Sequence, residues 1–278
     1  MQRIFIAAVL LLSGCAGTWE STPVVERMYV ITCGENHVKD LALFTGQAAD
    51  KDKAVVFSNY CYLIKHAQGW MLWDTGNADR LAAMPNGNPG PVATAFMKKP
   101  LADSLKELGV APAQIQHFAM SHHHGDHSGN ANYFGASMLY MQQAEYDAVF
   151  GPEPQKYNVA VANFEKLRGA KTVKLNGDHD VFRDGSVVIK ATPGHTPGHQ
   201  SLFVRLPKRG SVLLSGDMVH QSANWDAKRA PGFNFDVARS VQSMREVDTF
   251  LKQTGAQLWI NHDLAQNASI PKAPAFVE

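Results

Sequence analysis

Apolar residues gather in short runs along the chain, separated by polar and glycine-rich segments. These runs have the length and the β-branched or aromatic content of strands. They are Met28–Thr32, Asn59–Ile64, Met71–Trp73, Gln116–Met120, Val187–Ala191, Ser201–Leu206, Val212–Ser215 and Gln257–Ile260. Several are apolar throughout, which is typical of strands buried on both faces. We therefore expect these segments to form the buried sheet structure of the protein.

Other segments between the strands have the spacing of helices. Pro100–Gly109 carries leucines three and four residues apart, between a proline that favours a helix start and a glycine that favours a helix end. Asn158–Leu167 and Ala238–Leu251 are also predicted helices, whereas the Asn, Gly and Pro of Met84–Pro91 predict a surface loop. Strands interleaved with helices predict an α/β or α+β protein.

Length, composition and charge narrow the class of protein. The chain has 278 residues, of which 45% are hydrophobic and 18% charged, so a full core is available and disorder is excluded. We find no internal repeat and no linker, and expect residues 21–278 to form a single domain. The net charge of +1 argues against a nucleic-acid partner and against a polybasic membrane patch.

The first twenty residues have the pattern of an export signal. Arg3 precedes the apolar run Ile4–Leu12, which is too short to cross a bilayer, and Leu-Ser-Gly then leads into Cys15. This resembles a bacterial lipobox, in which the cysteine receives the lipid. The alternative is an ordinary signal cleaved near Ala16. We expect residues 1–20 to be a signal with a short tether, and the protein to be periplasmic or secreted, lipid-anchored through Cys15.

Two further cysteines, Cys33 and Cys61, each lie in a predicted strand. An oxidising compartment permits a cross-strand disulfide between them. The sequence leaves this alternative open but favours two buried free thiols. Neither cysteine has the spacing of a metal site.

The segment Ser121–Gly129 holds four histidines and an aspartate directly after a predicted strand. On an extended chain, residues two apart point the same way, so His122 and His124 can grip one metal ion together. Gly125 then permits a sharp bend, after which Asp126 and His127 can turn toward a second ion. Imidazole and carboxylate groups are ligands that zinc and similar divalent ions accept.

Three other candidate ligands also follow predicted strands. His195 lies in Thr-Pro-Gly-His-Thr-Pro-Gly-His, Asp217 in Ser-Gly-Asp and His262 in Ile-Asn-His-Asp. Because sites of α/β proteins gather where strands end, these side chains can converge at one edge of a sheet.

This ordered set resembles the metal-ligand set of the metallo-β-lactamase superfamily, as does the Asp74-Thr75-Gly76 turn after Leu72-Trp73. The resemblance spans about residues 28–265. It implies an αββα sandwich, in which two β-sheets lie face to face with helices outside. It also implies two divalent metal ions, zinc before the alternatives iron, manganese and cobalt.

The resemblance assigns a role to each residue of the set. The first ion is assigned to His122, His124 and His195, the second to Asp126, His127 and His262, and Asp217 is expected to bridge them. Asp74 is expected to orient a ligand histidine through a hydrogen bond, and His199 to be structural. We expect Asp126 to be catalytic as well as a ligand, and His123 to point away from the ions.

Asp217 also bears on the substrate. True β-lactamases of the superfamily generally carry cysteine or serine there, whereas lactonases, thioesterases, phosphodiesterases and organophosphate hydrolases carry aspartate. The chain is most similar to N-acyl-homoserine lactonases, which open a lactone ring and silence quorum signals. We therefore expect a metallohydrolase that attacks a small substrate with an electrophilic carbonyl. The alternatives are a periplasmic β-lactamase and an organophosphate or ester hydrolase. A non-catalytic or oxygen-reducing member would lack this complete ligand set or carry a flavin module.

One position departs from the lactonases. Many of them have a tyrosine three residues after the bridging aspartate, where this chain has His220. A histidine can also donate a hydrogen bond, so His220 is the candidate catalytic residue outside the ligand set. Apolar residues in loops are candidates for a substrate wall or for core packing: Leu41, Leu43, Phe44, Met218, Trp225, Phe233 and Phe235. The sequence does not fix the oligomeric state, for which a dimer is one alternative.

Overall fold

A computed structural model describes residues 25–278. The predicted signal and the candidate lipidation site Cys15 lie outside the described residues, so both stay predictions. Within residues 25–278, none of the helices combines the length and the apolar character needed to cross a bilayer.

The first sheet has eight strands in the order β4-β5-β1-β2-β3-β6-β7-β8. They are β1 Val25–Val38, β2 Val55–His66, β3 Gly69–Trp73, β4 Asn88–Pro89, β5 Ala93–Phe96, β6 Ile115–Ala119, β7 Met138–Gln142 and β8 Thr172–Leu175. The pairs from β4 to β3 are antiparallel, and those from β3 to β8 are parallel. The parallel strands bring the ends of β3 and β6 to the same edge.

The second sheet has the order β13-β12-β11-β10-β9. Its strands are β9 His179–Asp180, β10 Val187–Ala191, β11 Gln200–Leu206, β12 Gly210–Leu214 and β13 Gln257–Trp259. Only β12 and β13 pair in parallel, so both end at the same edge of this sheet.

Helices fill the connections. The α-helices are α1 Ala42–Thr45, α2 Leu101–Glu107, α3 Gly125–Ser128, α4 Gln143–Phe150, α5 Ser222–Asp226, α6 Val237–Thr254 and α7 Leu264–Asn267. The 3-10 helices are η1 Ala48–Asp50, η2 Asp79–Ala83, η3 Pro112–Gln114, η4 Ala131–Phe134, η5 Pro154–Tyr157, η6 Val161–Leu167 and η7 Gly216–Met218. The Asp236 side chain caps α6 by accepting from the Arg239 backbone N–H at 2.8 Å, and Gly255 ends this helix in the left-handed conformation.

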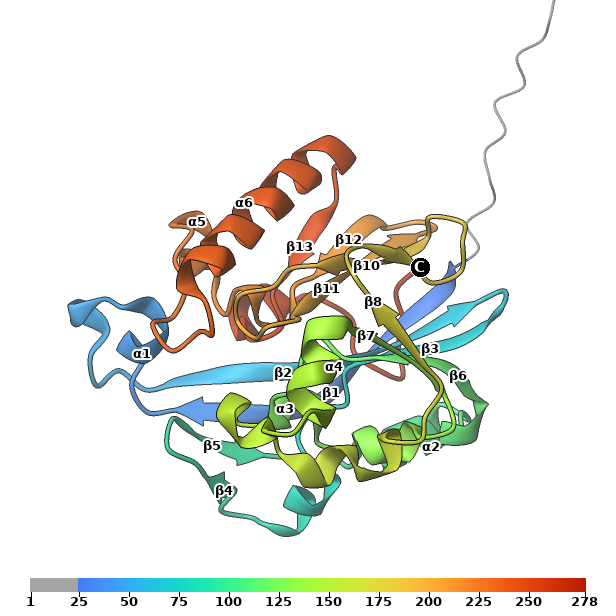
Figure 1. Ribbon diagram of the computed structural model, residues 1–278, viewed down its shortest axis with the longest axis horizontal. Coiled ribbons are helices and arrows are strands. Elements are labelled where there is room, and N and C mark those ends of the chain that lie inside the picture. Colours follow the sequence, from blue (N-terminus) through green and yellow to red (C-terminus); the bar gives the residue numbers. More distant parts are fainter. Residues whose placement is uncertain (1–24) are drawn as a thin grey trace, which may run out of the picture.

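The two sheets pack face to face because strand residues alternate between two apolar clusters. In β2, Tyr62 and Ile64 face the second sheet, whereas Cys61 and Leu63 face the outer cluster that contains α2. On the second sheet, Leu213 packs outward against α6. Figure 1 shows α6 along the outer side of β12 and β13, with α2 on the opposite side of the molecule. The predicted αββα sandwich is confirmed.

Some predicted elements differ from the observed ones. The strands β7 and β8 and the helix α4 were not expected, because Met138–Gln142 lacks β-branched residues and Thr172–Leu175 includes a lysine. The helix predicted for Asn158–Leu167 is instead the 3-10 helix η6, since Asn158 takes a left-handed φ of 56° and ends η5. The Met84–Pro91 loop contains the short strand β4.

Cys33 and Cys61 form a disulfide between β1 and β2, with their Cα atoms 5.8 Å apart. The expectation of two free thiols is therefore wrong. Adjacent antiparallel strands hold the two Cα atoms within the range that a disulfide spans. The sequence alone did not provide the register that creates this proximity.

Candidate metal centre

The seven candidate ligands lie in the connections that follow strand ends of the two sheets, with Asp126 and His127 in α3 and Asp217 in η7. The segment from His122 to His127 follows β6, His195 follows β10, Asp217 follows β12 and His262 follows β13. The parallel pairing of β12 with β13 places Asp217 and His262 side by side. The side chains form two groups, His122, His124, His195 and Asp217 in one, and Asp126, His127 and His262 in the other.

The first group has the spacing of ligands around one ion. The Nε2 atoms of His122 and His195 lie 2.9 and 3.0 Å from Nδ1 of His124. Two nitrogens bound to one tetrahedral zinc ion at roughly 2.0–2.1 Å would lie about 3.3 Å apart. These three imidazoles therefore need little movement to hold a metal ion.

The second group is more open but converges in the same way. The Nε2 atoms of His127 and His262 are 3.4 Å apart, and Asp126 Oδ2 lies 3.8 and 3.6 Å from them. His124 and Asp126 are half-buried, whereas His127 and His262 are buried. Asp126 thus offers its carboxylate from the solvent side of this group.

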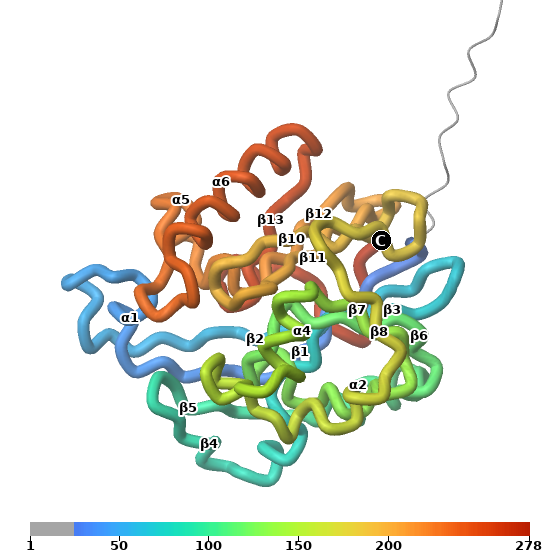
Figure 2. Tube along the Cα trace, viewed as in Figure 1, coloured from blue at the N-terminus to red at the C-terminus, as the bar shows by residue number. Residues whose placement is uncertain are grey.

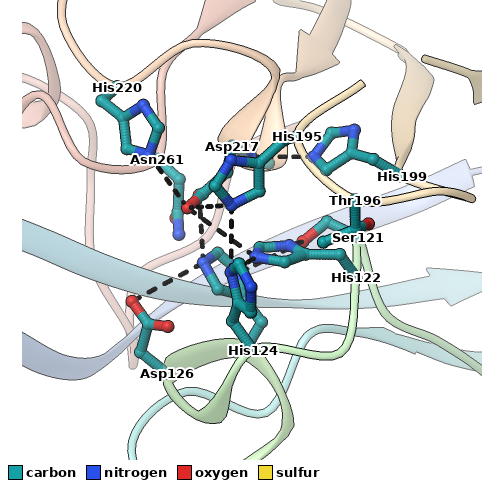
Figure 3. Close-up of polar contacts among 12 residues, drawn as sticks. Ser121, His122, His124, Asp126, His195, Thr196, His199, Asp217, His220 and Asn261 are labelled. Atoms are coloured by element: carbon teal, nitrogen blue, oxygen red, sulfur yellow. Dashed lines mark hydrogen bonds and ion pairs between the residues drawn. The ribbon is translucent and has the colours of Figure 1, made fainter. Parts of the chain in front are cut away.

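Asp217 lies between the groups and turns one oxygen toward each. Its Oδ1 is 3.1 Å from His127 Nε2 and 3.0 Å from His262 Nε2, while its Oδ2 is 3.4 Å from His195 Nε2. Figure 3 shows His122, His124 and His195 pointing toward this carboxylate, with Asp126 on the far side. Oδ1 is buried and has no well-aligned hydrogen bond to the two imidazoles beside it, so a cation at this position would satisfy it. The donor set and this atom fit a pair of divalent ions.

Each group has histidines whose remaining ring nitrogen is fixed by a hydrogen bond. In the first group, the Nδ1 atoms of His122 and His195 pair with Ser121 Oγ at 3.0 Å and with Asn234 Oδ1 at 2.9 Å. In the second group, Nδ1 of His127 lies 3.0 Å from Asp74 Oδ2, and Nδ1 of His262 donates to the Ser58 carbonyl at 2.7 Å. Such contacts fix ring orientation and leave Nε2 facing the group.

Asp74 reaches His127 because β3 and β6 end together. Its backbone has a left-handed φ of 59°, and its Oδ1 accepts the Ser121 backbone N–H at 2.6 Å. The carboxylate thus contacts both the start of the His-rich loop and one of its histidines. The Asp-Thr-Gly turn noted in the sequence is the structural support of this loop.

His199 contacts the backbone of Asp217. Its Nε2 accepts the Asp217 N–H at 2.9 Å, so the ring proton is on Nδ1, which donates to the Thr192 carbonyl at 3.1 Å. Burial lowers the pKa of His199 to about 3, which agrees with a neutral ring that accepts a hydrogen bond. His199 therefore fixes the position of the residue shared by both groups.

The two groups differ in electrostatics. Burial holds the pKa of His122 and His124 well below the usual range and lowers the pKa of His195 to about 4. Burial also opposes the charge of His127, yet Asp217 and other nearby carboxylates raise its pKa well above the usual value. The pKa of His262 is raised by Asp217 in the same way.

Asp217 itself is held as an anion. Burial alone would raise its pKa, but His262, His127 and the other surrounding imidazoles lower this pKa well below the usual value. A charged carboxylate between the two groups is the form that a metal ion requires.

His123 does not point to the surface. It is buried, and its backbone N–H and ring Nδ1 contact Glu145 Oε1 at 2.9 and 2.6 Å. The other oxygen of Glu145 accepts from Thr196 Oγ1 and from the Gly198 backbone N–H, both at 2.8 Å. Burial opposes charge on both partners, but the pair lowers the pKa of Glu145 and raises the pKa of His123. Glu145 thus joins the loop of His122 and His124 to the loop of His195.

His220 lies beside the shared aspartate. Its Nε2 is 3.2 Å from Asp217 Oδ2, and its ring stacks on His262 with centroids 5.7 Å apart. Phe44 contacts the ring edge-on at 5.0 Å, and Nδ1 is buried without a hydrogen-bond partner. His220 therefore adjoins both ligand groups and the apolar wall next to them.

A cleft of about 750 Å³ opens over both groups. Phe44, Phe233 and Phe235 line it, and the last two are 49% and 60% exposed. For Met218 and Trp225 the structure favours the alternative of core packing, since both pack in the cluster beneath α6. Leu41 packs against Phe57, which itself lines the cleft, whereas Leu43 is exposed on α1. The cleft is also lined by Leu81, Val92, Tyr157 and Pro197.

Several supporting residues were not identified from sequence. Asn36 donates to Asp126 Oδ2 at 2.7 Å, Asn59 donates to the Asp126 carbonyl at 2.5 Å, and Asn234 contacts His195. Asn59 is a polar residue in an otherwise apolar strand segment, and a buried amide needs hydrogen-bond partners. Its position in the sequence therefore could have indicated a supporting role. Asn36, Asn234 and Glu145 had no comparable pattern around them.

Comparison with known proteins agrees with this geometry. Residues 54–256 match the metallo-beta-lactamase superfamily. N-acyl homoserine lactonase AttM of Azorhizobium caulinodans is 31% identical, over 91% of this chain and 98% of that protein. An N-acyl homoserine lactonase of Bacillus thuringiensis is 26% identical, over 91% and 99%.

A solved structure extends the likeness to three dimensions. It is an N-acyl homoserine lactone hydrolase with the product N-hexanoyl-L-homoserine bound at its catalytic metal centre. It superposes with a TM-score of 0.77 at 25% identity, over 91% of this chain and 99% of that one. The fold, the converging His and Asp side chains and these matches identify the chain as a member of the metallo-beta-lactamase superfamily.

Proposed function

We propose that this protein is a metal-dependent N-acyl homoserine lactonase. The reaction adds water across the ring ester: the carbonyl carbon–oxygen single bond breaks, and a carboxylate and a hydroxyl form. The observation that carries the proposal is the pair of ligand groups that share Asp217 at the base of an aromatic-lined cleft. The relatives named N-acyl homoserine lactonase support the substrate class, because they match along almost their whole length.

The proposed metal ligands are those that the two groups contain. His122, His124 and His195 would hold one ion, Asp126, His127 and His262 the other, and Asp217 would contact both. Imidazole-rich groups with carboxylates favour zinc, and we propose zinc as the native metal. When bound, two such ions supply Lewis acidity and a water molecule acidic enough to ionise near neutral pH.

The chain's own residues orient the substrate and move protons. Phe44, Phe233 and Phe235 offer apolar surface to an acyl chain, so the polar ring end of the substrate points toward Asp217. His220 lies against Asp217 Oδ2 and is placed to donate a hydrogen bond to the ring ester. Asp126, half-buried and held by Asn36, is placed to accept a proton from the attacking water.

A substrate panel tests the proposal. The enzyme reconstituted with zinc should hydrolyse acyl-homoserine lactones faster than penicillins, cephalosporins or paraoxon-like esters, with turnover measured by proton release. Fast β-lactam or phosphotriester turnover with inert lactones would contradict it. His220→Tyr should retain more activity than His220→Phe, because only tyrosine keeps a hydrogen-bond donor.

We also propose that the protein is exported and anchored by lipid on Cys15. The disulfide between Cys33 and Cys61 supports an oxidising compartment, in which such bonds persist. Membrane fractionation of the full chain and of Cys15→Ala tests this. The native chain should sediment with membranes and the variant should be released; equal distribution of the two would contradict the anchor.

A further inference from the structure

The disulfide lies at an irregularity in the pairing of β1 and β2. Thr32 pairs with Tyr60 and Glu35 pairs with Ser58, so Cys33 and Gly34 together oppose Asn59. This is a β-bulge, which weakens the ladder locally and redirects the side chains that follow. Gly34 has a φ of 128°, and a Cβ there would meet the side chain of Asn77 at 2.5 Å.

The side chains redirected by this bulge hold one ligand of the second group. Asn36, three residues after Cys33, donates to Asp126 Oδ2 at 2.7 Å. Asn59, opposite the bulge and two residues before Cys61, donates to the Asp126 backbone carbonyl at 2.5 Å. Both strands at the disulfide therefore contact Asp126.

The same stretch of β2 also holds His262. The Ser58 carbonyl accepts from His262 Nδ1 at 2.7 Å, and Ser58 Oγ donates to the Asn261 carbonyl at 2.8 Å. Asn261 in turn donates to Asn59 Oδ1 at 3.2 Å and accepts the Tyr60 backbone N–H. Two of the three ligands in the second group thus depend on strand positions next to Cys61.

The first group lacks this dependence. His122 is oriented by Ser121 and His195 by Asn234. Within residues 25–278, no side-chain hydrogen bond joins β1 or β2 to His122, His124 or His195. Loss of the disulfide would therefore act unequally on the two groups.

We propose that the Cys33–Cys61 disulfide is a positioning element for the second metal-binding group, by fixing the β-bulge that places Asn36 and Asn59 around Asp126. The inference rests on the two-ion centre of the proposed function but not on the lactone substrate. Without the disulfide, β1 and β2 can shift at the bulge and Asp126 loses its fixed partners. The second ion is then bound less tightly while the first is retained.

Titration of chelator-stripped protein with Co²⁺, in competition with a chromophoric chelator, tests this. His262→Ala and His195→Ala assign the two stepwise dissociation constants to the two groups. In Cys33→Ala/Cys61→Ala, the dissociation constant of the second group should rise about tenfold or more, with the first changed less than about twofold. Asn36→Ala, which keeps the disulfide, should weaken the same group.

A phosphine reductant provides a second route on the native chain. The two sulfurs take up two electrons and two protons, while phosphorus is oxidised to the phosphine oxide with oxygen from water. Both cysteines are buried, so reduction of the native chain is slow; in the fraction that thiol titration shows to be reduced, the second ion should be released first. This route applies even if the double variant does not fold.

A core variant separates positioning from general destabilisation. Leu206→Ala removes a buried side chain between the sheets, and should leave the ratio of the two constants unchanged. Equal weakening of both groups in the double variant, or no weakening of either, would overturn the proposal. A native chain that binds fewer than two ions would instead contradict the proposed two-ion centre.

Discussion

The two ligand groups face each other across Asp217 but are built differently. The first consists of three histidines whose pKa values are lowered by burial, and the partners that orient His122 and His195 are a hydroxyl and an amide. The second contains Asp126 and two histidines whose pKa values are raised by carboxylates. The histidines of the first group are thus neutral and need release no proton to bind a cation, whereas those of the second group must release protons.

The residues that hold the two groups in place also differ. Glu145 joins the two loops that carry the first group, and it is buried beneath them. The second group depends on strand positions around the disulfide. The two ligand groups therefore have largely separate supports, although they share Asp217 and each has a histidine in contact with Ser121 Oγ.

The largest effect is expected at Asp217, the residue that both groups share. Asp217→Asn removes the charge that both groups face. Hydrolytic kcat/KM should fall about a thousandfold, because several kcal/mol of charge stabilisation are lost. Steady-state kinetics and metal analysis check this, with Asp226→Asn on α5 as the control. Unchanged turnover would mean that Asp217 is not a ligand.

A smaller effect is expected from the carboxylate beneath the first group. Glu145→Gln breaks a buried pair with His123 and should lower the free energy of unfolding by about 3 kcal/mol, measured with denaturant. Glu107→Gln, in an exposed pair with Lys99, should change it by about 0.5 kcal/mol or less. Similar losses in the two variants would refute a special role for Glu145.

Substitutions of the residues that orient the ligand histidines should have effects of intermediate size, and each should act mainly on one group. Asn234→Ala should weaken the first group roughly ten- to a hundredfold in metal affinity. Asp74→Asn should weaken mainly the second group by a similar factor, because Asp74 contacts His127 directly but reaches His122 only through Ser121. Stepwise metal titration distinguishes them. If either variant weakened both groups equally, the groups would not be independent.

A change of pH alone, without any substitution, should also separate the two groups. Because raised pKa values keep His127 and His262 protonated at higher pH than usual, metal binding there competes with protons as pH falls. The second dissociation constant should rise about tenfold per pH unit for each proton released, between pH 8 and 6. The first should stay nearly flat above pH 5, since the pKa of His195 is about 4. Equal slopes in calorimetric titrations would contradict this difference.

The convergence of the candidate ligands was predictable because they follow apolar strands, whereas their roles as ligands came from the family resemblance and stay predictions. His195, Asp217 and His262 are far apart in sequence, but strand ends converge at one edge of the sandwich. The fold followed from the same pattern together with the family resemblance. That residues 21–278 form a single domain stays a prediction.

The supporting contacts were less predictable, because they depend on register and not on residue type. Asn36 reaches Asp126 only because a bulge precedes it, and the Cys33–Cys61 disulfide depends on the pairing of β1 with β2. His123 gave no sign of its pair with Glu145, since α4 itself was not expected. Strands β7 and β8 were not predicted because their apolar patterns are weak.

Strand β1 also connects the start of the described chain to the second ligand group. Figure 2 shows the start of this strand near the C-terminus. The strand begins at Val25, next to the C-terminal segment through the Met28–Val277 bridge, and reaches Asn36, which donates to Asp126. Eleven residues of strand separate these points by roughly 35 Å, at about 3.3 Å per residue. The first described residue and the second ligand group therefore lie at opposite ends of one strand.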